Sequence, residues 1–149
     1  MKKLTGKCLC GAIAYEINGN LGPIVNCHCA KCRRWHGAAF RTRAAVASKK
    51  FKWLKGEAHL AKYHSSARII KTFCSICGSN LISIFEDNPD HIGLPIGGLE
   101  QDPGSRPLMN IFVASKAPWY EITDGLRQCD EWPDAGPDAV RTSSALSHA

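Results

Sequence analysis

The sequence of 149 residues predicts a single, mainly β domain, and three observations indicate this class. Short runs rich in Ile, Val and Phe recur along the chain, and several alternate apolar with polar residues. Segments rich in Gly, Pro, Asn and Asp separate the later runs. No stretch of about twelve residues repeats its apolar positions with the period of an α-helix.

The predicted strands follow from these patterns in chain order. In residues 12–17, Ile13, Tyr15 and Ile17 share one side of the chain, which is typical of a half-buried strand. Further strands are predicted at 38–46, 50–56, 59–64, 67–73, 80–85 and 110–115. Turns are predicted at 86–90, 95–98 and 101–107, and one short helix or turn at 30–36. Short strands at this spacing favour a small sandwich or a strongly bent sheet.

No linker divides the chain, so we expect one domain over residues 1–132. Residues 133–149 are rich in Pro, Gly, Asp, Ser and Ala and predict a loose C-terminal tail. No run approaches eighteen apolar residues, so no transmembrane helix is expected. The start of the chain has no apolar signal region, and we expect a cytoplasmic protein.

Charge is distributed unevenly along the chain. Residues 1–75 contain 15 Lys and Arg against 2 Asp and Glu, whereas residues 76–149 contain 4 against 11. A basic first half is compatible with an anionic substrate, an acidic partner or nucleic acid. The two halves can equally neutralise each other in the folded domain, so both interpretations stay open.

Eight cysteines in such a chain need an explanation other than disulfides. Seven of them form three clusters: Cys8 and Cys10; Cys27, Cys29 and Cys32; and Cys74 and Cys77. Residues i and i+2 of a strand point to the same side, and a C-x-x-C turn directs two sulfurs towards one ion. The first and last clusters therefore predict a closed zinc site with four cysteine ligands, the usual structural type.

The middle cluster is one ligand short of a closed site. Three protein ligands and an open position are the pattern of a catalytic zinc, and the open position can accept water or a thiol. Cys129, His28 and His36 are alternatives for a fourth ligand. His28 alternates with two cysteines, so in an extended stretch it is expected to point away from their sulfurs.

Two other uses of the cysteines remain open. An iron–sulfur cluster takes the same residue type, although the paired spacing favours zinc. Cys74 and Cys77 also have the spacing of a redox pair, but the surrounding sequence lacks the βαβ setting that such a pair requires.

Basic residues after the middle cluster are candidates for substrate binding. Arg33 and Arg34 follow it directly, and either can neutralise the thiolates or hold a substrate carboxylate in a bidentate pair. Arg41 and Arg43 extend this run, but we expect them on a solvated basic face. Trp119 is expected in the core, where large aromatic residues are usually found.

Four segments of the chain resemble the family of glutathione-dependent formaldehyde-activating enzymes, which also includes centromere protein V. The segments are GKCLCGAIAYEI (6–17), NCHCAKCRRWHGAAF (26–40), KTFCSICGSNL (71–81) and NIFVASKAPWYEI (110–122). The similarity extends from about residue 4 to residue 132. Asn110 stands where the family commonly has His, and Cys129 where it commonly has an aromatic residue, which argues against Cys129 as a ligand.

The resemblance implies a β-tent fold, small bent sheets held together by zinc, with two zinc ions per chain. It implies a structural zinc on Cys8, Cys10, Cys74 and Cys77, and a catalytic-type zinc on Cys27, Cys29 and Cys32. The implied activity is that of a carbon–sulfur lyase, which adds a small thiol such as glutathione to formaldehyde or a related small aldehyde and gives S-hydroxymethylglutathione.

A binding module is the alternative function. Two closed zinc sites would then stabilise a small domain whose basic half binds nucleic acid or an acidic partner. The sequence lacks a recognition helix, and its aromatic residues do not clearly interleave with the basic ones, so nucleic acid is the less favoured partner.

Overall fold

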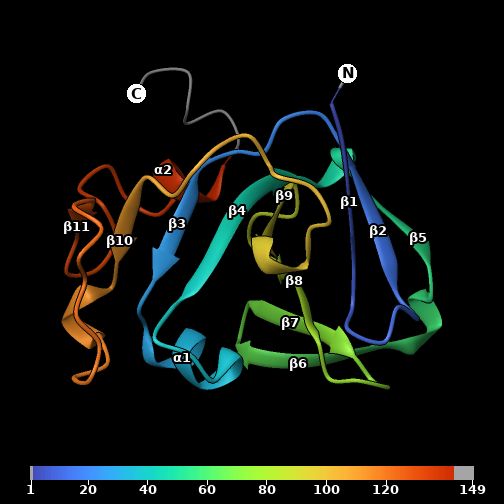
Figure 1. Cartoon of the computed structure of the whole chain (residues 1–149), viewed down its shortest axis with the longest axis horizontal. Coiled ribbons are helices and arrows are strands. Elements are labelled where there is room, and N and C mark those ends of the chain that lie inside the picture. The colour runs from blue at the N-terminus through green and yellow to red at the C-terminus, as the bar shows by residue number, and fades with distance from the viewer. Residues whose placement is uncertain (1, 143–149) are drawn as a thin grey trace.

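The structure, a computed structural model, describes residues 2–142, which form two β-sheets (Figure 1). The small sheet has the order β1 (Lys3–Lys7), β2 (Ala14–Asn18) and β5 (Phe51–Lys55). The large sheet has the order β11 (Arg127–Gln128), β10 (Met109–Ile111), β3 (Ile24–Cys27), β4 (Arg41–Ala47), β9 (His91–Pro95), β8 (Asn80–Phe85), β7 (Ile69–Cys74) and β6 (Leu60–Ser66). The predicted mainly β class is confirmed.

The helices are few and short. α1 (Ala30–His36) coincides with the short helix predicted there, and α2 (Asp138–Arg141) lies near the end of the described chain. We expected little to bury after residue 133, but Val140 of α2 is buried, and its carbonyl accepts a hydrogen bond from Arg43 Nη1 at 3.0 Å. The rest of the predicted tail, residues 143–149, lies outside the described residues.

Each predicted strand is present, and the segment predicted at 110–115 ends early. Its strand stops at Ile111, because Phe112 adopts a left-handed φ of 57° and a 3-10 turn, Val113–Ser115, follows. The strands β1, β3, β9 and β11 were missed. β9 contains Gly93 and Pro95, which are more typical of turns, and β3 is buried throughout and too short to show a period.

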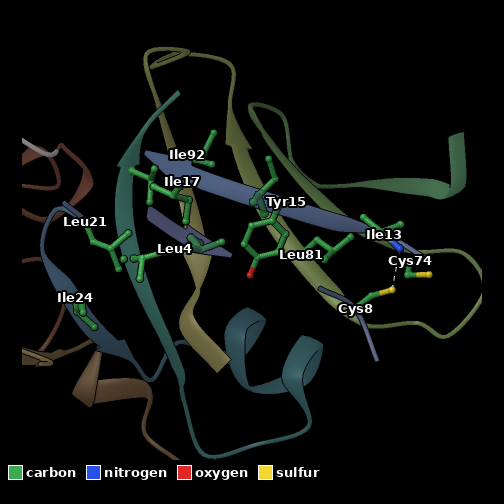
Figure 2. Packing of buried hydrophobic residues seen from close by; sticks show 14 residues of the cluster. Leu4, Cys8, Ile13, Tyr15, Ile17, Leu21, Ile24, Cys74, Leu81 and Ile92 are labelled. Atoms are coloured by element: carbon green, nitrogen blue, oxygen red, sulfur yellow. Dashed lines mark hydrogen bonds between the residues drawn. The ribbon is translucent and has the colours of Figure 1, made fainter. Parts of the chain in front are cut away.

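The main core lies between the two sheets. Figure 2 shows Leu4, Tyr15 and Ile17 of the small sheet beside Leu81 and Ile92 of the large sheet. Gly6 is required in β1, because a Cβ atom there would lie 2.2 Å from the Tyr15 ring. Close packing of this kind fixes the small sheet over one face of the large one.

The other face of the large sheet is polar. Ala44 and Val46 of β4 lie in the core, so the side chains of Arg41 and Arg43 point to the opposite face, as alternation along a strand requires. α1 contacts β4, and α2 contacts both β4 and β9. The second face therefore carries the groups that a functional site needs.

Candidate metal centres and an adjoining pocket

Two turns bring the four outer cysteines together. Cys8 and Cys10 lie in the turn after β1, rather than on a strand as expected, and Cys74 and Cys77 lie where β7 ends. Their four Sγ atoms lie within 4.8 Å of one another. The Cys8–Cys10 distance is 3.6 Å and the Cys10–Cys74 distance is 3.9 Å. Sulfurs around a tetrahedral zinc are about 3.8 Å apart, given a Zn–S bond of about 2.3 Å, so this cluster fits zinc.

Each turn is closed by a glycine in the left-handed region. Gly11 and Gly78 both have φ of 77°, and their backbone N–H groups donate to the carbonyls of Cys8 and Cys74. An L side chain at either position would be strained, so glycine allows the tight turn that brings the two sulfurs of each pair together.

Backbone and hydroxyl groups surround these sulfurs. The Ile13 N–H donates to Cys8 Sγ at 3.3 Å, a bond drawn in Figure 2. Hydrogen bonds with the side chain and backbone of Ser79 lower the pKa of Cys77 to about 5, which favours the thiolate that a metal requires.

The middle cysteines meet where β3 passes into α1. Cys27 ends β3, and Cys29 is the N-cap of α1, its sulfur accepting a hydrogen bond from the Cys32 N–H at 3.3 Å. The three Sγ atoms lie within 4.8 Å of one another. Cys27 and Cys32 are buried, whereas Cys29 is half-buried. Among residues 2–142, this group has three members, so a bound metal ion keeps a position open to a further ligand.

None of the proposed fourth ligands joins the cluster. His28 points away from the sulfurs, as expected, and its Nε2 lies 2.8 Å from Asn110 Oδ1. His36 accepts a hydrogen bond at Nδ1 from the Asn80 amide at 3.1 Å. Cys129 is buried in the same apolar cluster as Cys27 and Cys32, but its sulfur is not one of the three that lie within 4.8 Å of one another.

The three middle thiols compete for ionisation. Hydrogen bonds with Cys27 and Cys32 lower the pKa of Cys29 to about 2, and the same contacts raise the pKa of Cys27. Three thiolates this close repel one another unless a cation lies among them. The donor set is therefore one that a metal ion stabilises.

Three buried cations lie on the same face as this cluster. Arg41 stands opposite Cys27 in the β3–β4 ladder, and Arg43 lies two residues further on. Arg41, Arg43 and Lys71 are only 3%, 4% and 7% exposed. The expected solvated face is therefore wrong for both arginines, because alternation along β4 turns them inwards beneath α1 and α2.

The thiols provide negative charge close to these cations. Burial lowers the pKa of Arg41, and the neighbouring thiolates of Cys32 and Cys27 oppose that effect. Burial and Arg41 together lower the pKa of Lys71 to about 8. Among residues 2–142, none of the three cations has an ion pair with Asp or Glu: Arg41 Nη2 donates to the Gly93 carbonyl, and Lys71 Nζ donates to Ser83 Oγ.

The two arginines that follow the middle cluster point to different places. Arg33 Nε donates to the Ser115 carbonyl at 3.1 Å. Arg34 instead lines a pocket of about 370 Å³ with Lys31, Trp35, Tyr63, Ser65 and Lys71. The Trp35 ring and the Lys71 ammonium are in contact in this pocket, with Lys71 Nζ 4.9 Å from the ring centroid.

Sequence reasoning missed several of these positions. Lys31, Trp35, Tyr63 and Lys71 show no local pattern that sets them apart, because α1 and the β6–β7 pair meet only in the folded chain. The core prediction for Trp119 is wrong, since that side chain is 72% exposed.

Asn110 links His28 and Asp124 through hydrogen bonds near the middle cluster. Its amide donates to both oxygens of Asp124, at 3.2 and 3.1 Å, so its carbonyl oxygen faces His28. Because that oxygen accepts, His28 Nε2 donates, which fixes the orientation of the ring. Asn110 thus orients His28, the residue between Cys27 and Cys29.

By class this is a mainly β protein with two cysteine clusters that could each hold a metal ion. The model of the family of glutathione-dependent formaldehyde-activating enzymes matches residues 3–115, which include both clusters, and the chain belongs to that family. The predicted resemblance is confirmed.

A solved structure supports the same fold. The crystal structure of a Rhodobacter sphaeroides protein is similar to this one with a TM-score of 0.56 and 24% sequence identity. The similarity covers 69% of this chain and 91% of that chain. Among the helices within residues 2–142, none has both the length and the apolar character needed to cross a membrane.

Proposed function

We propose that the protein is a carbon–sulfur lyase that adds a small thiol such as glutathione to formaldehyde or a related small aldehyde. The observation that carries this proposal is the three-thiol cluster, which leaves a ligand position free in a chain of this family. The thiol sulfur forms a bond to the carbonyl carbon, and the thiol proton ends on the carbonyl oxygen. With glutathione and formaldehyde the product is S-hydroxymethylglutathione.

We propose zinc as the metal at both clusters. Cys8, Cys10, Cys74 and Cys77 would hold the structural ion, and Cys27, Cys29 and Cys32 the catalytic-type ion. Zinc at the second site supplies an open position at which a thiol is stabilised as the more nucleophilic thiolate. Three thiolates and a divalent ion carry a net charge of −1, which the buried guanidinium of Arg41 offsets.

The other contributions of the chain are binding and orientation. Thiols add to aldehydes without a catalyst, so the protein acts mainly by placing the two reactants together. Arg33 and Arg34 are the proposed substrate contacts, and Arg34 is the better placed, because Arg33 already donates to the Ser115 carbonyl. None of the eight cysteines, all within the described residues, is in a disulfide, and this supports the proposed cytoplasmic location, where thiols stay reduced.

A binding module that uses a basic face has less support. Arg41, Arg43 and Lys71 are buried beside the thiols. Other basic residues of the first half pair with acids, as Lys3 does with Glu16 and Lys7 with Glu100. These contacts reduce the positive surface that nucleic acid would bind.

Metal analysis combined with exchange kinetics tests the proposed function. Zinc and iron are measured per chain in protein purified without chelator, and we expect two zinc ions and no iron. The conversion of glutathione and formaldehyde to S-hydroxymethylglutathione, and its reversal, are then followed by NMR exchange. We expect the exchange rate to rise in proportion to the protein concentration. A fully zinc-loaded protein that leaves the spontaneous rate unchanged would falsify the proposed activity. A salt-dependent gel shift of plasmid DNA in the presence of the protein would favour the binding module.

A further inference from the structure

The pocket beside α1 is basic and aromatic. We call it the α1 pocket and define it by its six lining residues, Lys31, Arg34, Trp35, Tyr63, Ser65 and Lys71. Three of them are cations, and no Asp or Glu of residues 2–142 is among them. Its volume of about 370 Å³ lies in the range of small-molecule sites.

Regular structure holds both walls of the α1 pocket. Lys31, Arg34 and Trp35 are spaced i, i+3 and i+4 on α1 and so share one face of the helix. Tyr63 stands directly opposite Lys71 in the β6–β7 ladder, so these two side chains lie on one face of the sheet. The cations are thus brought together by the fold rather than by a flexible loop.

The positive charge in the α1 pocket has no protein counterpart. Within residues 2–142, Lys31, Arg34 and Lys71 form no ion pair. Lys71 is the buried member, held by Ser83 Oγ and by the face of the Trp35 ring. A buried ammonium without an anion is costly, so the α1 pocket favours an anionic group.

The α1 pocket and the three-thiol cluster share a helix. Cys32 lies next to Lys31 on α1. The Trp35 ring, which lines the α1 pocket, has its centroid 4.9 Å from Lys71 Nζ and 5.7 Å from Cζ of Arg41, the residue opposite Cys27. A ligand anchored in the α1 pocket therefore sits beside the cluster, and the ligand that must reach the cluster is the thiol.

We propose that the α1 pocket binds a carboxylate of the thiol substrate, so that the protein selects thiols carrying a carboxylate remote from the sulfur over neutral thiols. Lys31, Arg34 and Lys71 receive the carboxylate, while Trp35 and Tyr63 contact the apolar part of the substrate chain. The inference rests on the proposed function for the identity of the ligand, but its binding test does not depend on turnover.

Binding is tested with S-methylglutathione, which keeps both carboxylates and has no free thiol. We expect calorimetric binding to the zinc-loaded wild-type protein, and a loss of about ten-fold in affinity for Lys31→Gln and for Arg34→Gln. Lys62→Gln is the matched control, because Lys62 is exposed on β6 and does not line the α1 pocket. The diethyl ester of the same probe is expected to bind about as weakly as the variants do.

Kinetics then separate this inference from the proposed function. For Arg34→Gln we expect the ratio of kcat/KM for glutathione to kcat/KM for 2-mercaptoethanol to fall about ten-fold, through a higher KM for glutathione. Equal losses with both thiols would indicate a structural role, and S-methylglutathione that binds wild type and variants alike would also overturn the inference. Charge-dependent binding without any turnover would instead remove the proposed reaction and leave the α1 pocket as an anion site.

Discussion

The two cysteine clusters differ in the length of chain that they join. Cys10 and Cys74 are 64 residues apart, and their cluster ties the turn after β1 of the small sheet to the end of β7 in the large one. Cys27, Cys29 and Cys32 instead lie within one strand end and the helix that follows it.

This difference separates a folding role from a chemical one. An ion in the four-cysteine cluster closes a long loop and joins the two sheets, so its binding free energy becomes folding free energy. The three-cysteine cluster lies where β3 passes into α1, and its three members leave a ligand position of a bound ion open to a substrate. Stability and turnover should therefore respond in opposite ways when each cluster is altered.

Cys74→Ser should have the largest effect. The apparent contribution of a structural zinc to folding is on the order of 10 kcal/mol, comparable to the whole stability of a domain of about 5–15 kcal/mol. We expect the variant to lose its cooperative thermal transition, as followed by circular dichroism. Cys129→Ser is the control, because Cys129 is buried but belongs to neither group of sulfurs that could hold a metal. A native-like transition in Cys74→Ser would remove the structural role of the four-cysteine cluster.

Cys27→Ser should give the reverse result. We expect the variant to keep its amide NMR spectrum outside the β3–α1 region, to bind one zinc ion fewer, and to lose thiol–aldehyde exchange by about a hundred-fold or more. Its zinc content and exchange rate are measured on the same preparation. Full activity after this substitution would contradict the use of the three-thiol cluster in the reaction.

Local sequence carried most of the information on the cysteine sites. The spacing of Cys8 with Cys10 and of Cys74 with Cys77 predicted one cluster, although a turn rather than a strand brings the first pair together. The orientation of His28 also followed from simple alternation. These features depend on a few neighbouring residues, and such short-range geometry is what spacing can express.

The basic face could not be predicted in the same way. Arg41 and Arg43 were expected in solvent because they are charged, but their burial depends on α1 and α2, which cover that face from distant parts of the chain. Lys71 meets α1 only through the order of the large sheet. The family resemblance supplied the fold, whereas the α1 pocket is formed by tertiary pairing.

Asn80 links the four-cysteine cluster to the helix of the three-cysteine cluster, so its removal should moderately affect both clusters. It begins β8, three residues after Cys77, and its amide donates to the Trp35 carbonyl and to His36 Nδ1 at the end of α1. For Asn80→Ala we expect a loss of about 1–2 kcal/mol in chemical denaturation, together with weaker zinc retention at the three-thiol cluster under mild chelation. Asn20→Ala, at an exposed position, is the control, and zinc retention equal to wild type would show that the clusters are independent.

His36 should give the smallest effect, visible as a dependence of stability on pH. Burial, together with the nearby charge of Arg41, lowers the pKa of His36 to about 4, whereas the unfolded chain has a value of about 6.5. The stabilising effect of keeping the ring neutral is fully present above about pH 6.5, and it is lost as pH falls towards 4, because the unfolded chain then binds a proton that the folded chain does not.

His36→Gln should therefore flatten the stability profile between about pH 7 and about pH 5. Chemical denaturation at both values, on zinc-loaded protein, gives the difference, and His59→Gln at an exposed position serves as the control. Acid also releases metal from thiolates, but that loss is common to all three proteins and cancels when their slopes are compared. If His36→Gln lost stability as steeply as the wild type between these pH values, the acid sensitivity would come from the thiolate clusters alone. Protonation of His36 would then not affect the contact between α1 and β8.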